Sequence, residues 1–392
     1  MSELEQVHVH IGPLKTGTTY VQQMLVGNQR VLDEQGATFY GVDFKEHATA
    51  VKHLMGRRRR RDGVASSDTD QWTALVDEAR ASGARTAMVS MEYLCTADSS
   101  AVQRLVSSVA PARVRIVFTA RDYSRLIPAA WQTALRNQHA PTWQEFIDSI
   151  RDPEGEDGVW GRRFWRQQDP RQVLAPYLEH LQPDQITVVT MPPSADPPDL
   201  LWRRFCAATG LTAEPFDLGA VRRSNPSLGG VEAEVLRRIN LEVAGRVPGA
   251  VYTDLVKVFV AREVLELRPQ SFRLGLAEDE YDWLDERARD QQAYIAAAGF
   301  DVVGDLAELV PLRRPAERRP DSATEPEVAA VLTEVLGATL REVARRQSLQ
   351  RWDGARSVQE PLPEPAALGL SGRPPRPGER LRGRVQFRTE RG

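Results

Sequence analysis

One segment limits the possible folds of this 392-residue chain more than any other: HIGPLKTGTTYVQ, residues 10–22. Alternating apolar residues over 6–12 predict a short strand, and apolar residues at helical spacing after the segment predict a helix. Gly12 and Gly17 lie between the two. A glycine loop in that place turns backbone N–H groups and the positive end of the helix dipole toward one point. The segment therefore predicts a phosphate-binding loop after the first strand.

The position of the lysine separates this loop from the common nucleotide-binding P-loop. Gly12 and Gly17 keep the spacing of G-x-x-x-x-G-K-[ST], but two threonines follow the second glycine. The lysine of the loop, Lys15, lies between the glycines. An ATP-dependent enzyme usually has a strand that ends in a metal-binding aspartate, whereas the strand-like RVRIVFTAR ends in Arg121. This combination predicts that fixed cations, and no metal, bind an anionic ligand.

The alternation of strand and helix continues along the chain. Strand-like segments recur at residues 85–92, 113–121 and 184–191, each after a segment with helical periodicity. Strands that alternate with helices form mainly parallel sheets with right-handed crossovers. The sequence therefore predicts an α/β, P-loop-like fold with a central, mainly parallel sheet of about five strands, flanked by helices, plus a helical C-terminal part.

Changes in composition divide the chain further. An α/β domain is expected over residues 1–310, with a helical subdomain at about 199–300. Residues 311–324 are rich in proline and arginine and predict a linker, and residues 325–350 have the pattern of an amphipathic helix. The tail, residues 351–392, is rich in proline, glycine and arginine and has few large apolar residues, so disorder is expected there.

Charge and cysteine content argue against several classes of protein. The net charge of -3 gives no overall basic field, so no nucleic-acid partner is expected. The arginines at 57–61 are either a solvated loop or a contact for an anionic ligand. Cys95 and Cys206 lack metal-ligand spacing and are expected to be reduced core residues. Without a leader pattern or an apolar run of about 18 residues, a cytoplasmic protein with no membrane span is expected.

Two segments together resemble a known enzyme family. GPLKTGTT (residues 12–19) and FTARDYSRLIPAAWQ (residues 118–132) are similar to the cofactor-binding segments of sulfotransferases that use 3′-phosphoadenosine 5′-phosphosulfate (PAPS). RRSNPSLGGVEAEVLRRIN (residues 222–240) resembles bacterial members of that family. In the family, the first segment binds the 5′-phosphosulfate, and its lysine contacts the bridging oxygen and the leaving phosphate. The resemblance thus implies that Lys15 stabilises the leaving group and that the cofactor binds Gly12, Pro13, Thr16, Gly17, Thr18 and Thr19.

The second segment departs from the family pattern at one position. The family binds the 3′-phosphate with an arginine and a serine eight residues later; Arg121 matches the arginine, but Ala129 stands in place of the serine. Ser124, on a neighbouring face of the same predicted helix, is a candidate replacement donor. In the third segment the resemblance implies that Arg222 or Arg223 lies near the 3′-phosphate or the adenine, and a solvated linker is the alternative.

The acceptor hydroxyl needs a general base. The family places its base, a histidine or a glutamate, in the loop after a buried strand, and Glu92 occupies that place here. The alternative role of Glu92 is to pair with Lys15 or Arg121. His47 and His53 are rival bases. The two histidines at positions 8 and 10 share one face of the first strand and are expected to be packed or hydrogen-bonded.

These features predict a sulfotransferase that moves a sulfuryl group from PAPS to a hydroxyl, less readily to an amine, and releases adenosine 3′,5′-bisphosphate. The acceptor is a small molecule, a glycan or a lipid. One alternative is a P-loop nucleotide kinase-like phosphotransferase, which the position of Lys15 disfavours. The other is a catalytically inactive binding protein with a sulfotransferase fold, which Ala129 keeps open. The identity of the acceptor and the oligomeric state do not follow from the sequence.

Overall fold

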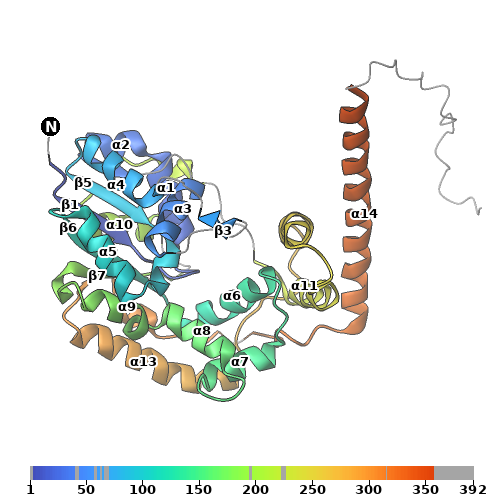
Figure 1. Cartoon of the computed structure of the whole chain (residues 1–392). Helices are drawn as coiled ribbons and strands as arrows, with labels where there is room; N and C mark the ends of the chain where they lie inside the picture. Colours follow the sequence, from blue (N-terminus) through green and yellow to red (C-terminus); the bar gives the residue numbers. More distant parts are fainter. Residues whose placement is uncertain are drawn as a thin grey trace, which may run out of the picture. The chain divides into compact units, whose positions relative to one another are not determined.

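A parallel sheet of six strands is the centre of the fold (Figure 1). The structure, a computed structural model, describes residues 3–39, 44–56, 60–61, 64–65, 70–193, 197–221, 227–314 and 316–356. Neighbouring strands are hydrogen-bonded in parallel in the order β2-β5-β1-β6-β7-β8. Their bounds are β1 (Gln6–His10), β2 (Ala37–Phe39), β5 (Thr86–Ser90), β6 (Arg113–Ala120), β7 (Ile186–Thr190) and β8 (Asp301–Val303). The predicted α/β fold with a mainly parallel central sheet is confirmed.

The sheet is wider than the predicted five strands because each edge holds one short strand. β2 and β8 have three residues each, which is too short for alternation to be recognised in the sequence. A separate antiparallel pair is formed by β3 (Arg60–Arg61) and β4 (Val64–Ala65). The four longer strands β5, β1, β6 and β7 are the ones that the sequence predicted, since most of their residues are buried.

Helices cover both faces of the sheet. One face packs against α3 (Phe44–Leu54), α4 (Gln71–Ala81), α5 (Ser99–Val109) and α9 (Pro170–Leu178). The other face packs against α1 (Thr18–Gly27) and α10 (Leu200–Thr209), where Met24, Leu25 and Trp202 are almost completely buried. Alternate strand residues point to the two faces, so His10 lies on the α10 side, with its ring centroid 5.5 Å from that of Phe205.

A second core is formed mainly by helices and contains no strand residue among those described. Trp131 and Trp143 meet edge to face within it, with ring centroids 5.6 Å apart. The sequence expected a helical subdomain at 199–300, but α10 packs on the sheet, and helices from residues 123–168 join this second core. Its helices are α6 (Tyr123–Arg136), α7 (Trp143–Arg151), α8 (Val159–Gln168), α11 (Gly230–Val243), η4 (Tyr252–Leu265), α13 (Asp282–Ala297) and the start of α14 (Glu325–Arg356).

The remaining elements are short. They are α2 (Gln29–Glu34), η1 (Glu92–Thr96), η2 (Pro183–Gln185), η3 (Leu218–Ala220), α12 (Gly249–Val251), η5 (Glu278–Glu280) and η6 (Leu306–Leu309). The chain divides into two compact units, residues 1–336 and 337–392, and residues 357–392 of the second, most of the predicted disordered tail, lie outside the described residues. α14 extends beyond the helix predicted at 325–350. Among the helices of the described residues, none combines the length and the apolar character needed to cross a bilayer.

Candidate active site

The loop between β1 and α1 has two residues in the left-handed backbone region. Gly17, directly before α1, has a φ of 87°, and a Cβ atom there would lie 2.4 Å from Cδ2 of Leu201. Lys15 has a φ of 73°, which is uncommon for a residue with a side chain. Backbone strain of this kind persists only where the surrounding contacts hold it, and it gathers at ligand-binding sites. The loop therefore has a defined shape before any ligand binds.

The first turn of α1 offers hydrogen-bond donors to a ligand. The first N–H groups of a helix have no partner within the helix, and no side chain caps α1. Thr19 in this turn is exposed and lines a large cavity, as do Gly17 and Thr18. The arrangement is one that an anion can bind, because the N–H groups and the helix dipole favour negative charge.

Two threonine hydroxyls brace the loop from within. The Thr16 hydroxyl donates to the carbonyl oxygen of Pro13 at 2.7 Å, and its oxygen lies 2.7 Å from Oγ1 of Thr119. The Thr18 hydroxyl donates to the carbonyl oxygen of Gly12 at 3.0 Å. Both side chains are buried. The carbonyls of Gly12 and Pro13 thus accept bonds inside the loop, and Leu14, Lys15 and Gly17 of the loop line the cavity.

A buried chain of hydrogen bonds continues beneath the loop. His10 Nδ1 lies 2.8 Å from the Ser90 hydroxyl, and His10 Nε2 lies 3.3 Å from the Thr119 hydroxyl, which contacts Thr16. Burial lowers the pKa of His10 to about 3, so the imidazole is neutral and can donate from one nitrogen while accepting at the other. The prediction that His10 is hydrogen-bonded is confirmed. The chain connects the ends of β5, β1 and β6 to the loop.

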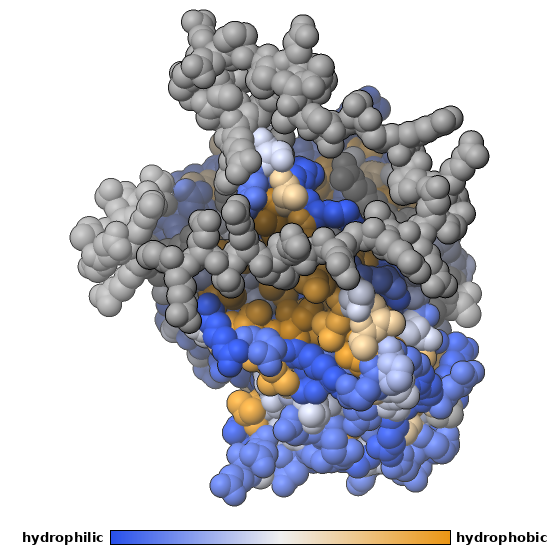
Figure 2. All heavy atoms as spheres, turned by 90° about the vertical axis from the view of Figure 1, so that its right-hand side faces the viewer, coloured by the Kyte–Doolittle hydropathy of each residue, from blue (hydrophilic) through white to orange (hydrophobic). Residues whose placement is uncertain are grey.

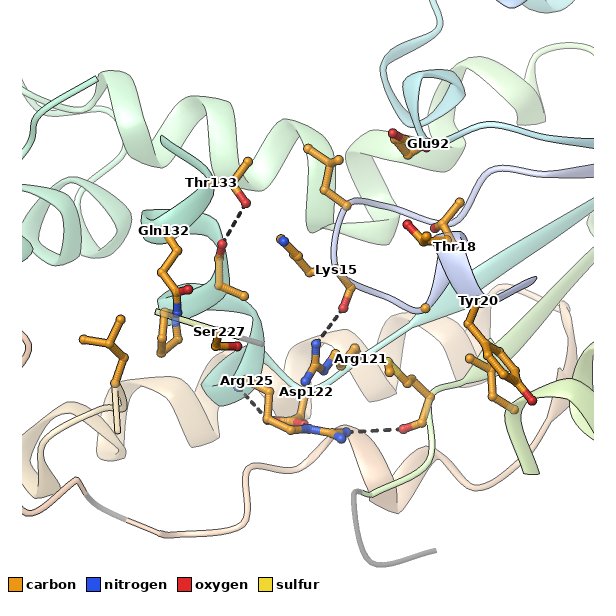
Figure 3. A pocket seen from close by; sticks show the side chains of 18 of the residues that line it. Lys15, Thr18, Tyr20, Glu92, Arg121, Asp122, Arg125, Gln132, Thr133 and Ser227 are labelled. Atoms are coloured by element: carbon orange, nitrogen blue, oxygen red, sulfur yellow. Dashed lines mark hydrogen bonds and ion pairs between the residues drawn. The ribbon is translucent and has the colours of Figure 1, made fainter. Parts of the chain in front are cut away.

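Lys15 places its ammonium group in the cavity. Figure 3 shows its side chain directed away from the loop toward α6, where Gln132 and Thr133 lie. Burial, followed by repulsion from Arg136, lowers the pKa of Lys15 to about 8, and the carboxylates of Glu266 and Glu92 oppose that change. The Lys15 side chain is exposed to the cavity, and its ammonium forms no ion pair with a carboxylate of the described residues, so an anionic ligand can reach it.

Arg121 follows β6 and is tied to the same loop. Its Nη1 donates a hydrogen bond of 2.6 Å to the backbone carbonyl oxygen of Lys15 (Figure 3). Its Nε is buried and has no hydrogen-bond partner among the described residues. Burial, then repulsion from Arg125, lowers the pKa of Arg121 to about 10. A buried, unsatisfied donor on a cation is costly, so this guanidinium is prepared for an acceptor that the described residues do not supply.

The start of α6 is held by its own residues. Asp122 caps the helix by accepting from the backbone N–H of Arg125, and the Arg125 guanidinium pairs with the same carboxylate. The Ser124 hydroxyl also donates to Asp122. Ser124, Arg125 and Ala129 all line the cavity. The Ser124 hydroxyl is thus used locally, and Ala129 presents no side-chain donor where the resemblance expects one.

Glu92 follows β5 as the first residue of η1 and also lines the cavity. No hydrogen bond or ion pair to another described residue involves its carboxylate, and it is half-buried. In Figure 3 it lies on the other side of Lys15 from Arg121. Its carboxylate therefore faces the same space as Lys15 without being neutralised by it.

The cavity has a volume of about 2710 Å³. Its polar wall is formed by the loop, η1 and α6, and apolar residues such as Phe272, Leu274 and Leu276 also line it. Figure 2 shows a similar mixture on one face of the molecule, where apolar residues gather near the middle and hydrophilic residues surround them. A cavity of this size exceeds the usual range of about 300–1,000 Å³ for one small ligand, so it has room for two substrates.

Comparison with known proteins adds one structural likeness. No family model matches the chain, and no curated protein matches its sequence. A sulfotransferase from Alicyclobacillus acidocaldarius, known from its crystal structure, is similar with a TM-score of 0.39 and 15% sequence identity, over 63% of this chain and 98% of that one. At this level of similarity, the roles of individual residues here depend on the geometry described above.

The other predicted residues have different surroundings. Arg222 and Arg223 lie outside the described residues; Ser227, the next residue that the structure describes, lines the cavity. His47 lines the cavity but is buried, stacks on Phe39 and accepts a hydrogen bond from the backbone N–H of Ser90 at 3.1 Å. His53 accepts from a backbone N–H in α4 and is not among the described residues that line the cavity.

Sequence reasoning missed several residues that the structure brings to the cavity. Arg125 could have been found from its position one turn after Arg121, but Arg136 and Glu266 are 130 positions apart, and no local pattern connects them. Cys95 and Cys206 are buried and neither is in a disulfide, as predicted. Among the described residues, no three histidine, cysteine, aspartate or glutamate side chains gather as a metal site requires, and the metal-free reaction stays a prediction.

Proposed function

We propose that the chain transfers a sulfuryl group from PAPS to an acceptor hydroxyl. One observation carries the proposal: Glu92, the Lys15 loop and Arg121 follow β5, β1 and β6, which are adjacent in the sheet. Since parallel strands end at the same edge, a carboxylate and two cations meet around one cavity there. A phosphosulfate donor needs cations at its phosphates, and a hydroxyl acceptor needs a base.

The residues fit a donor that carries two separated phosphates. The uncapped end of α1 and the Lys15 ammonium would bind the 5′-phosphosulfate. The unpartnered Nε of Arg121 would bind the 3′-phosphate. Ser124 and, from outside the described residues, Arg223 are further candidates for the 3′-phosphate or the adenine. Gly12 and Pro13 would act through the shape of the loop.

The proposed reaction needs one base and one cation. The acceptor oxygen forms a bond to sulfur while the bond between sulfur and the bridging oxygen breaks, and the Glu92 carboxylate takes the acceptor proton. Negative charge then grows on the 5′-phosphate, which departs as part of adenosine 3′,5′-bisphosphate. Lys15 would stabilise that charge, the role that metal ions have in kinases. An amine is a less favourable acceptor in this proposal, and a glycan, a lipid or a small molecule would supply the hydroxyl.

Calorimetry on the full chain tests the donor. We expect adenosine 3′,5′-bisphosphate to bind more tightly than ATP and equally well with and without EDTA. Preference for ATP together with a magnesium requirement would favour the kinase-like alternative. Incubation with radiolabelled PAPS and pooled acceptors, followed by mass spectrometry, should reveal products heavier by one sulfuryl group. Tight binding of the bisphosphate without any labelled product would favour the inactive binding protein.

A further inference from the structure

Three cations line the part of the cavity at the C-terminal end of α6. They are Arg136 on α6 and Lys257 and Arg262 on η4, and we call them the basic wall. The two helices come together here, because the Arg136 guanidinium forms an ion pair with Glu266, which directly follows η4. The basic wall belongs to neither the phosphate-binding loop nor the start of α6.

The basic wall has more positive charge than its own carboxylate can neutralise. Glu266 is buried and lies 2.7 Å from Nε of Arg136, so its charge is already paired. Lys257 donates to the neutral amide oxygen of Asn137 at 2.8 Å. Arg262 has no ion-pair partner among the described residues. Lys257 and Arg262 are therefore without a counter-charge from the part of the chain that the structure describes.

The cations of the basic wall act on one another. Burial, and after it the positive charges of Arg136 and Arg262, lowers the pKa of Lys257. The three positive charges are therefore close enough to repel one another. An anion placed among them would remove the repulsion, and its interaction with the half-buried Arg136 and Lys257 would be stronger than in water.

The basic wall lies at the opposite end of α6 from Arg121. α6 has 14 residues and, at about 1.5 Å per residue, separates its two ends by about 20 Å. Arg121 stands before the first end, and Arg136 is at the last. The charges of both Arg136 and Arg121 lower the pKa of Lys15, so the Lys15 ammonium is affected by both ends of α6. With the loop and Arg121 assigned to the donor, the far end of the cavity is left to the acceptor.

We propose that the basic wall binds an anionic group of the acceptor, so that the acceptor is an acidic molecule with both a hydroxyl and a carboxylate, phosphate or sulfate. This inference rests on the proposed function and specifies its substrate class. Lys257 and Arg262 would hold the anionic group, and Arg136, kept in place by Glu266, would form the floor beneath it. The hydroxyl of the acceptor would then point toward Lys15 and Glu92.

Binding of matched acid and neutral probes tests this inference without requiring catalysis. The full chain, saturated with adenosine 3′,5′-bisphosphate, is titrated by calorimetry with 4-hydroxyphenylacetate, glucuronate and glycerol phosphate, and with their neutral counterparts 4-hydroxyphenylacetamide, glucose and glycerol. We expect at least one acidic member to bind about tenfold or more tightly than its counterpart, the scale of one hydrogen bond between charged groups. Equal binding within all three pairs, including no binding at all, overturns the inference.

Variants assign the preference to the basic wall. Arg262→Gln, at an exposed site, and the double variant with Lys257→Gln should remove the preference for the acidic probe and leave affinity for adenosine 3′,5′-bisphosphate unchanged. Arg246→Gln is the matched control, because Arg246 is exposed, pairs with Glu242 and does not line the described cavity. Arg136 is left intact, since its removal would strand the buried Glu266 carboxylate.

Two outcomes separate this inference from the proposed function. If Arg262→Gln weakens the bisphosphate and leaves the acidic probe unaffected, the basic wall belongs to the nucleotide site and the inference is wrong. If binding of the acidic probe depends on the basic wall but radiolabelled PAPS yields no product, the anion-binding site is supported and the proposed sulfuryl transfer is wrong.

Discussion

Nη1 of Arg121 donates a 2.6 Å hydrogen bond to the backbone carbonyl oxygen of Lys15, the loop residue with a φ of 73°. The bond joins the end of β6 to the loop after β1, so one guanidinium both holds the shape of the loop and keeps its Nε for a ligand. Arg121→Gln should therefore weaken binding of adenosine 3′,5′-bisphosphate about tenfold or more, measured by calorimetry. Arg30→Gln, at an exposed i,i+4 pair with Glu34 that does not line the described cavity, is the control. If both variants bind the bisphosphate with equal affinity, Arg121 is not part of the nucleotide site.

Lys15→Ala should lower turnover far more than affinity for the bisphosphate product. The product no longer has the developing charge of the leaving group, so a contact made mainly in the transition state appears in kcat. A loss of about 10²–10³ in kcat is the scale for one electrostatic donor. Steady-state kinetics and calorimetry on the same preparation give the two values. Matching losses would make Lys15 a binding residue only.

The pH dependence of the free enzyme should report the same lysine. Because the pKa of Lys15 lies at about 8, its ammonium form decreases as the pH rises through that value. We expect kcat/KM for PAPS to fall as the pH rises through about 8. We expect kcat to fall only at higher pH, because the bound anion raises the pKa of Lys15. Lys15→Arg should keep its charge and move the fall in kcat/KM upward. An unchanged profile in that variant would assign the titration to another group.

Glu92→Gln keeps the size of the side chain and removes its basicity. Because the Glu92 carboxylate has no partner among the described residues, the variant should fold normally and bind the bisphosphate as the original chain does. Turnover with an alcohol acceptor should fall by about 10²–10⁴, and by less with a phenol, whose proton leaves more easily. Full activity toward the alcohol would exclude Glu92 as the base. His47 would then be tested next, since it lines the cavity.

His10 should make the fold sensitive to acid. Its pKa falls from 6.5 to about 3 on burial, so the folded state binds fewer protons than the unfolded state between these values. The free energy of unfolding should therefore decrease as the pH falls below about 6.5, by up to about 1.4 kcal/mol per pH unit. Denaturant unfolding of His10→Gln should show a smaller decrease. A decrease should remain in the variant, because burial also lowers the pKa of His8, to about 4, and the pKa of His139. An identical slope in the variant would contradict the assignment to His10.

Short-range patterns were enough to predict the individual groups of the site. Gly12, Lys15 and Gly17 lie within six consecutive residues of one loop, and the two glycines have the spacing of a known phosphate-binding motif. Arg121 and Glu92 could be found because each directly follows a buried strand, and a strand of five to eight residues has a clear apolar pattern. The sequence thus determined the α/β fold, the loop and the residue types at the strand ends.

Only the tertiary structure decided which of these groups meet and what supports them. The order β5-β1-β6 brings Glu92, Lys15 and Arg121 to one cavity, and this order depends on pairings between distant strands. The bonds of His10 to Ser90 and Thr119 span 80 and 109 positions, and the pair of Arg136 with Glu266 spans 130. Hydrophobic periodicity reports which face of one element is buried, but it carries no information on which distant element covers that face. Packing of whole elements selects those contacts, so the buried supports of the loop and the basic wall became visible only in the folded chain.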